Sequence, residues 1–370
     1  MPEAPYVAFD VTPLQNGHRV RGIGTYVRGL AAQLLSQDEV PIEFWGWADD
    51  PPLEPRPPHR GWWLPRLGVP RTRFPSLLRI AMSARCAVSG AGVVHITDPN
   101  ALVVPEARRM MTTVYDLIPL HQGRSAETPG YRRYLSRLQS VGTIFAISEA
   151  TAQDVVATLS VPQGRVVVAR PGVEIPPRDD SAPAPVPGKF FLYVGSPDPH
   201  KNVGLLLEAI KLCRDLPEKL VIAGNWPEQN VEALRSIADA DPALRERVEH
   251  LGYVTPDELL ALFHSCTAVV MPSLIEGFGL PVAEAMAAGA AVVHSSLAVL
   301  DEVSAGCALT FAPTSATELA ACLRKVSTDE ALRHNLIARS RLRAETLTWR
   351  DALERTLRAY RVALDGGGRD

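Results

Sequence analysis

Paired cysteines are missing from this sequence. Its five cysteines, in a chain of 370 residues, are scattered and form no Cys-x-x-Cys motif or Cys/His cluster. Neither a disulfide framework nor a structural zinc site is therefore predicted. This cysteine usage fits a reducing compartment best, so we expect a cytoplasmic protein.

Long apolar runs are also missing. No uninterrupted apolar stretch reaches the roughly 18 residues that a transmembrane helix needs. The first residues, MPEAPYVAFDV, lack the basic region followed by an apolar stretch that marks a signal peptide. We expect a soluble protein that at most lies at a membrane surface.

An excess of charge of either sign is the third absence. The 38 Lys and Arg residues nearly balance the 41 Asp and Glu residues, and the formal net charge is −3. The chain as a whole has no electrostatic reason to bind nucleic acid or an anionic membrane. We expect no nucleic-acid partner, and any contact with a polyanion must be local.

What the sequence does contain is a regular alternation of short β-like runs with helical patterns. Parallel strands need crossover connections, which are usually helices, so this alternation predicts an α/β fold with parallel sheets. The expected strands are 6–11, 93–97, 112–117, 144–148, 190–196, 219–224, 248–254 and 267–273. The expected helices are 23–35, 149–159, 202–214, 231–238 and 256–265.

A proline-rich break divides this pattern in two. The segment 174–188, EIPPRDDSAPAPVPG, removes backbone donors and disfavours helix, which predicts an interdomain linker. We place an N-terminal domain at 1–175, the linker at 176–188 and a C-terminal domain at 189–349. In open α/β sheets ligands lie beyond the carboxyl ends of the strands, so the site is expected in the cleft between the two domains.

The segment 51–75 departs from this rhythm, because its density of proline predicts a long irregular loop. The simpler interpretation is a flexible surface insertion. The alternative is a loop that contacts the acceptor or a membrane surface, with arginines offered to phosphates and Trp62 and Trp63 offered to a lipid or sugar face. Those arginines are Arg56, Arg60, Arg66, Arg71 and Arg73.

The stretch SLIEGFGLPVAEAMAAGAAVV, 273–293, places two carboxylates in an otherwise apolar segment. The strand expected at 267–273 ends where this stretch begins, and a loop, a short helix and a second strand should follow. Glu276 then lies after the first strand, and Glu284 lies about one turn into the helix. The glycines let the backbone approach a ligand closely, and the free amides at the helix start suit an oxygen-rich or anionic group. Carboxylates accept hydrogen bonds from vicinal hydroxyls, so the combination suggests a nucleotide sugar. The plainer alternative is that Glu276 is a solvated charge in a loop and that Glu284 lies on the polar face of an amphipathic helix.

The wording EGFGLPVAEA closely resembles the E-x7-E signature of the retaining glycosyltransferases of family GT4, whose GT-B architecture consists of two Rossmann-like domains. The resemblance extends over nearly the whole chain. YVGSPDPHKNVGLLLEAI at 193–210 is similar to the family's diphosphate-binding strand, loop and helix, and RGIGTYVRGL at 21–30 to its glycine-containing loop. It also implies that the last segment, 350–370, contains a helix that returns to the N-terminal domain.

The resemblance implies roles for individual residues. Glu276 would bind hydroxyls of the transferred sugar, Glu284 would bind the ribose, and Lys201 would neutralise the departing diphosphate. No metal or other cofactor is implied. Further donor-binding residues would be Gly277, Phe278, Gly279, Leu280, Ser196, His200, Gly22 and Gly24.

Two departures from the family pattern bear on the chemistry. Ser196 and His200 stand where many relatives have arginine, which leaves more of the phosphate charge to Lys201, with His200 beside it. Tyr115-Asp116 stands where many relatives have His-Asp. Tyr115 either offers its hydroxyl to the sugar or is the last packed residue of a strand, whereas Asp116 is a general base or an orienting ligand. Asp10 and Asp98 follow strands too, but such residues are more often turn or cap residues.

The preferred interpretation is a metal-independent, retaining hexosyltransferase that uses a nucleotide sugar, with mannose from GDP-mannose as the best match to the wording VYDLIPL and HKN. The acceptor would be a hydroxyl of a glycan, a lipid-linked molecule or a small natural product. Alternatives are a donor with UDP or dTDP, and a non-catalytic sugar-binding protein of the same fold. Asp239-Ala240-Asp241 resembles a metal-binding Asp-x-Asp but reads as a helix-end turn, and the dinucleotide-binding GxGxxG is incomplete after Gly22 and Gly24.

Overall fold

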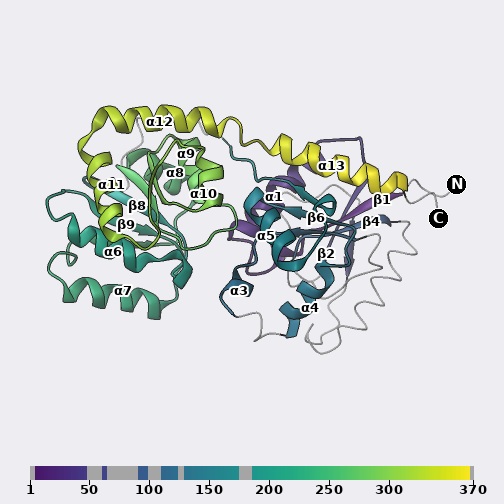
Figure 1. Ribbon diagram of the computed structural model, residues 1–370, viewed down its shortest axis with the longest axis horizontal. Helices are drawn as coiled ribbons and strands as arrows, with labels where there is room; N and C mark the ends of the chain where they lie inside the picture. Colours follow the sequence, from purple (N-terminus) through teal and green to yellow (C-terminus); the bar gives the residue numbers. More distant parts are fainter. Residues whose placement is uncertain are drawn as a thin grey trace. The chain divides into compact units, whose positions relative to one another are not determined.

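The computed structural model describes residues 5–47, 61–64, 91–98, 110–123, 129–174 and 186–366. The chain forms two compact units, of which unit 1 comprises residues 1–172 and 349–370, and unit 2 comprises residues 173–348. Each unit has a parallel sheet flanked by helices (Figure 1). The predicted α/β class with two Rossmann-like domains is confirmed. Within the described residues, no helix is both long and apolar enough to cross a membrane.

Unit 1 is built on a seven-stranded sheet in the order β3-β2-β1-β4-β5-β6-β7, and all its pairs are parallel. Its strands are β1 (Tyr6–Asp10), β2 (Ile42–Trp47), β3 (Gly61–Leu64), β4 (Ala91–Ile96), β5 (Met110–Val114), β6 (Thr143–Ala146) and β7 (Val166–Val168). Its helices are α1 (Gly22–Leu35), α3 (Ile118–His121), α4 (Pro129–Leu138), α5 (Glu149–Leu159) and α13 (Trp349–Gly366).

Unit 2 is built on a six-stranded parallel sheet in the order β10-β9-β8-β11-β12-β13. Its strands are β8 (Phe190–Val194), β9 (Lys219–Ala223), β10 (Val248–Gly252), β11 (Ala268–Met271), β12 (Val292–Ser295) and β13 (Leu309–Phe311). Its helices are α6 (Val203–Leu212), α7 (Glu228–Ala240), α8 (Pro256–Ser265), α9 (Leu280–Ala288), α10 (Ala298–Ser304), α11 (Ala316–Thr328) and α12 (Glu330–Ala344).

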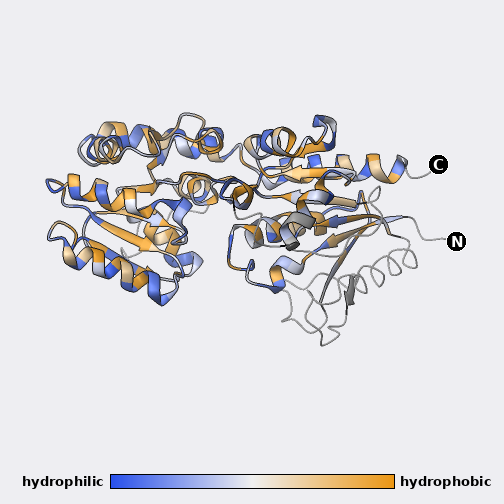
Figure 2. Cartoon of the chain, turned by 60° about the horizontal axis from the view of Figure 1, so that its bottom comes forward, coloured by the Kyte–Doolittle hydropathy of each residue, from blue (hydrophilic) through white to orange (hydrophobic). Residues whose placement is uncertain are grey.

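The central strands β8 and β11 of unit 2 are apolar along their whole length because helices cover both faces of a parallel sheet. The four residues 190–193 of β8 are all buried, and so are all four residues of β11. Figure 2 shows hydrophobic residues concentrated on the strands of each unit, whereas the surrounding helices alternate between hydrophobic and hydrophilic residues. Each sheet is therefore the core of its own unit.

The interpretation of 51–75 as one irregular loop is wrong at residues 61–64. These residues form β3, which pairs in parallel with β2 so that Trp62 lies opposite Trp45. The four residues GWWL contain no proline, and tryptophan favours extended backbone in a sheet. The proposed phosphate-binding arginines, from Arg56 to Arg73, lie outside the described residues.

The C-terminal helix α13 belongs to unit 1 and packs against α1 (Figure 1). Trp349, its first residue, lies where a side chain on Gly29 of α1 would have to be, so a glycine is needed at that point of closest approach. Further along α13, the hydroxyl of Tyr360 lies 2.5 Å from Nδ1 of His95, whose Nε2 lies 2.9 Å from Oγ1 of Thr113. Burial lowers the pKa of His95 to about 3, so this histidine joins the helix to the sheet as a neutral ring.

Candidate functional site

The predicted unit, a strand at 267–273 followed by a loop, a short helix and a strand, is present as β11, a loop, α9 and β12. Gly279 ends the loop with a φ of 93°, in the left-handed region that favours glycine, and a side chain there would also meet Leu300 of α10. Gly289 ends α9 in the same conformation, with a φ of 82°. The backbone of this loop is therefore determined by its glycines, and it presents Glu276 five residues beyond the end of β11.

Glu276 forms an ion pair with Lys201, which comes from a different part of unit 2. Lys201 ends the short 3-10 helix η5 (Pro199–Lys201), and its Nζ lies 2.7 Å from Oε1 of Glu276. The same carboxylate oxygen accepts a hydrogen bond of 2.6 Å from the hydroxyl of Ser273. Only 18% of the lysine side chain and 7% of the glutamate side chain are exposed, so water screens this pair little.

Hydrogen bonds hold the two loops that carry this pair. The Leu274 amide donates to the carbonyl oxygen of His200 at 2.8 Å. Nδ2 of Asn202, a residue with a φ of 57°, donates to the carbonyl oxygens of Pro272 and Pro313. Because β8 and β11 are neighbours in the sheet, the loops that follow them meet at the same edge. The hydrogen bonds between these two loops thus determine the positions of both Lys201 and Glu276.

Glu284 lies in α9, one turn after its start, and is partly buried. Burial raises the pKa of its carboxyl group to about 7. This residue therefore changes its charge near neutral pH. A neutral carboxyl group accepts hydrogen bonds more weakly than a carboxylate, so the protonation state of Glu284 bears directly on any hydroxyl group that it binds.

We expect the affinity for a nucleotide sugar to fall by about tenfold as the pH is lowered from 8 to 6. The sign follows from the raised pKa: Glu284 is half protonated near pH 7, and at lower pH it no longer offers a carboxylate to the ribose hydroxyls that it is predicted to bind. Titration calorimetry at several pH values measures this, and a nucleotide sugar is the right ligand because its diphosphate has no proton to lose in that range. In Glu284→Gln the affinity should no longer depend on pH. If the affinity of this variant still falls between pH 8 and pH 6, Glu284 is not the group responsible.

The other donor-binding candidates of unit 2 lie in the same two loops. Ser196 follows β8, and its hydroxyl donates to Oδ2 of Asp198 at 2.6 Å. His200 contributes its carbonyl oxygen to the contact between the loops. Gly277 and Phe278 lie between Glu276 and Gly279, and Phe278 is buried. Leu280 is the first residue of α9. The structure therefore brings together Lys201, Glu276 and the residues predicted around them.

The candidates of unit 1 lie directly after β5 and in the first turn of α1. Tyr115 follows β5 and is 6% exposed, and its ring contacts the ring of Tyr26 edge-on at 5.7 Å. Among the described residues its hydroxyl has no hydrogen-bond partner, and burial raises the pKa of Tyr115 well above its usual value. Oδ1 of Asp116 accepts a hydrogen bond of 3.0 Å from the Ile118 amide at the start of α3. Gly22 and Gly24 lie in the first turn of α1, and the loop at His18 packs on Gly24.

Asp10 acts as a structural residue at this edge, as the turn interpretation predicts. It is buried and accepts hydrogen bonds from the amides of Thr12, Thr97 and Asp98, which joins the ends of β1 and β4. Burial and the neighbouring charge of Asp98 raise the pKa of Asp10 to about 6. Asp98 itself accepts a hydrogen bond of 3.0 Å from Nδ2 of Asn16.

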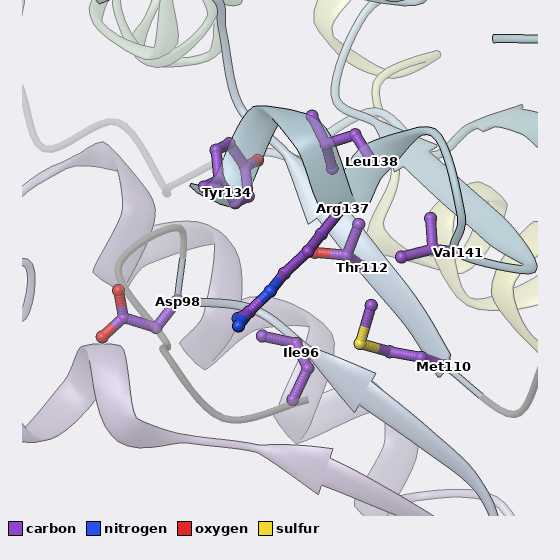
Figure 3. Close-up of a pocket in the computed structure, with 8 residues that line it drawn as sticks. All are labelled: Ile96, Asp98, Met110, Thr112, Tyr134, Arg137, Leu138 and Val141. Carbon is purple, nitrogen blue, oxygen red and sulfur yellow. The ribbon is translucent and has the colours of Figure 1, made fainter. Parts of the chain in front are cut away.

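A small pocket of unit 1 that the sequence analysis did not find lies beside Asp98. Figure 3 shows the Arg137 side chain reaching from α4 across this pocket towards Ile96 and Asp98. Its lining residues lie in β4, β5 and α4 and in the loops after β4 and α4, so no local pattern could have indicated it. The lining residues are Ile96, Asp98, Met110, Thr112, Tyr134, Arg137, Leu138 and Val141.

The Asp239-Ala240-Asp241 match is a helix-end turn, as predicted. Asp239 and Ala240 end α7, and Oδ1 of Asp241 accepts a hydrogen bond from the Ala243 amide at 2.9 Å. The other oxygen of Asp241 lies 3.3 Å from Nζ of Lys211. In the described part of the chain, no group of three or more His, Cys, Asp or Glu residues could hold a metal ion.

Comparison with known proteins connects this geometry to one enzyme family. Residues 20–175 match the family model described as Glycosyltransferase Family 4, and residues 177–343 match the model for Glycosyl transferases group 1. A serotype-specific mannosyltransferase of Escherichia coli, WbdA, is 30% identical over 256 residues, which cover 64% of this chain and 31% of WbdA. The O-antigen chain mannosyltransferase B of the same species is 26% identical and covers 71% of this chain and 73% of its own.

Solved structures agree with the family matches at the level of the fold. HepE of Anabaena, solved in complex with UDP and glucose, superimposes with a TM-score of 0.76 at 16% identity, over 97% of this chain and all of its own. WaaG, a glycosyltransferase involved in lipopolysaccharide biosynthesis, superimposes with a TM-score of 0.67 at 17% identity, over 95% and 98%. The alignment with WbdA spans less than a third of that relative's length.

Proposed function

Because this chain belongs to the group 1 glycosyltransferases of family 4, we propose that it transfers a hexose from a nucleotide sugar to a hydroxyl group, with retention of the anomeric configuration. The observation that carries the proposal is the Lys201–Glu276 pair at the carboxyl edge of the unit 2 sheet. It places a cation suited to a diphosphate next to an acceptor suited to sugar hydroxyls. Glu284, on the next helix, would bind the ribose.

The proposed step breaks the bond between the anomeric carbon and the diphosphate oxygen. The electron pair stays on the diphosphate, where the ammonium group of Lys201 stabilises the developing charge. The acceptor oxygen bonds to the anomeric carbon on the same face, and its proton passes to the leaving diphosphate. We propose that no metal ion takes part, because the ammonium group of Lys201 supplies the cation that the developing charge on the diphosphate needs.

For the donor we propose mannose from GDP-mannose. The support is the presence of mannosyltransferases among the relatives of this chain. HepE was solved with UDP and glucose, so a UDP-sugar is the competing donor that the experiment must include. The proposed acceptor is a hydroxyl of a glycan, a lipid-linked molecule or a small natural product, and we place the reaction in the cytoplasm, at the inner face of the membrane if the acceptor is lipid-linked. All four described cysteines are free, which supports a reducing compartment.

The proposal is tested by ligand-induced stabilisation. Purified protein is heated with GDP, UDP, dTDP or ADP and with their common sugar conjugates, in the presence of a chelator. A ligand at about a hundred times its Kd should add roughly 2.7 kcal/mol to the free energy of unfolding, which is easily measured. We expect one nucleotide to give a shift that is abolished in Lys201→Ala. Folded protein that responds to none of them would contradict the transferase proposal and favour a sugar-binding protein of the same fold.

A further inference from the structure

Two aromatic side chains hold successive carbonyl groups in the loop that follows β8. The indole Nε1 of Trp226 donates a hydrogen bond of 2.7 Å to the carbonyl oxygen of Gly195. The hydroxyl of Tyr193 donates one of 2.7 Å to the carbonyl oxygen of Ser196. The peptide groups on both sides of Ser196 are therefore anchored by side chains and not by the sheet.

Neighbouring strands hold Trp226 in place. Its ring lies against the ring of His250 in β10, with centroids 5.0 Å apart and planes inclined at 43°. Nε2 of His250 lies 3.1 Å from the carbonyl oxygen of Gly224, and the Gly224 amide donates to Gly252 at 2.8 Å. Because β10 restrains both the ring and its loop, the indole N–H has a defined direction toward Gly195.

Anchoring the Gly195 carbonyl also orients the next amide. A trans peptide group is planar, so its N–H points opposite to its C=O. With the carbonyl directed at Trp226, the Ser196 N–H is directed away from the indole. Within the described residues no hydrogen bond from this amide is found, and the residue that follows, Pro197, has no N–H at all.

We propose that Trp226 is a positioning residue that orients the Ser196 amide to donate a hydrogen bond to the diphosphate of the nucleotide sugar. Lys201 supplies the positive charge from the same loop, five residues further on. An oriented amide supplies a directed hydrogen bond to an anion without carrying a charge of its own. The inference rests on the proposed function, since it assumes a diphosphate ligand beside Lys201.

The test uses Trp226→Phe, which keeps an aromatic ring and removes the N–H. Dissociation constants are measured by calorimetry for the nucleoside diphosphate that stabilises the wild-type protein and for its nucleoside. We expect Trp226→Phe to weaken binding of the nucleoside diphosphate by about tenfold and to change the affinity for the nucleoside less than twofold. The KM for the nucleotide sugar should rise by a similar factor with a smaller change in kcat. Tyr253→Phe is the matched control, because Tyr253 follows β10 and is 63% exposed, and it should leave all these values unchanged.

A purely structural role predicts a different result. If Trp226→Phe lowers the affinity for the nucleoside and for the nucleoside diphosphate equally, or lowers neither affinity, the positioning role is wrong. If the wild-type protein binds a diphosphate and loses it in Lys201→Ala but not in Trp226→Phe, this inference fails while the proposed function stands. A wild-type protein that binds no nucleotide overturns both.

Discussion

Replacing Lys201 by alanine is expected to lower turnover by about a hundredfold or more while the protein stays folded. The lysine is the cation that pairs with Glu276, and its proposed partner in the reaction is the leaving diphosphate. Without it, the charge that develops on the diphosphate lacks a charged donor in a region that water screens little. The measurement is kcat at saturating donor, with release of the nucleoside diphosphate as the readout.

Lys211 provides a matched control for this variant. It lies in unit 2, is 24% exposed and makes ion pairs of 2.8 Å with Glu208 and 3.3 Å with Asp241. Lys211→Ala therefore removes an ion-paired lysine of similar exposure that is not part of the proposed site. It should retain the activity of the wild-type protein. If Lys201→Ala retained activity within threefold of this control, Lys201 would have no part in the chemistry.

Local patterns in the sequence were sufficient for the parts of the site that are local. The glycines of EGFGLP determine a loop between β11 and α9, and the structure has that loop where it was predicted. The strands predicted at 190–196 and 219–224 are present as β8 and β9, which end two residues and one residue earlier, and their apolar runs are typical of central parallel strands. The short edge strands β3 and β13 have no such signal, and β3 lies between prolines that argue against a strand.

Contacts between distant residues could not be predicted in the same way. Lys201 and Glu276 are 75 residues apart, and they meet because β11 lies next to β8 although β9 and β10 come between them in the chain. Local sequence patterns indicate which segments are strands, but they do not reveal the order of those strands across the sheet. Trp226 was missed for a related reason: a single aromatic residue in a loop has no periodicity, and only its hydrogen bond to the carbonyl oxygen of Gly195 points to the proposed role.

Glu276→Gln is expected to separate binding of the sugar from binding of the diphosphate. Turnover should fall by about a hundredfold or more, because a neutral amide is a weaker acceptor for the sugar hydroxyls. The affinity for the nucleoside diphosphate without its sugar should instead rise on the order of several-fold. In the free protein Lys201 is engaged by Glu276 at 2.7 Å, and removing the negative charge frees the lysine and lessens repulsion of the ligand.

These opposite effects distinguish a role in the site from a role in folding. A variant with a damaged fold would bind both the nucleotide sugar and the nucleoside diphosphate more weakly. A freed Lys201 instead favours the nucleoside diphosphate. Glu208→Gln is the matched control, since it removes a carboxylate that pairs with Lys211 at 2.8 Å on the surface of the same unit, and neither value should change. If Glu276→Gln lowered the affinity for the nucleoside diphosphate as much as Lys201→Ala does, the two residues would act as one structural unit. The assignment of the sugar to Glu276 and of the diphosphate to Lys201 would then have to be abandoned.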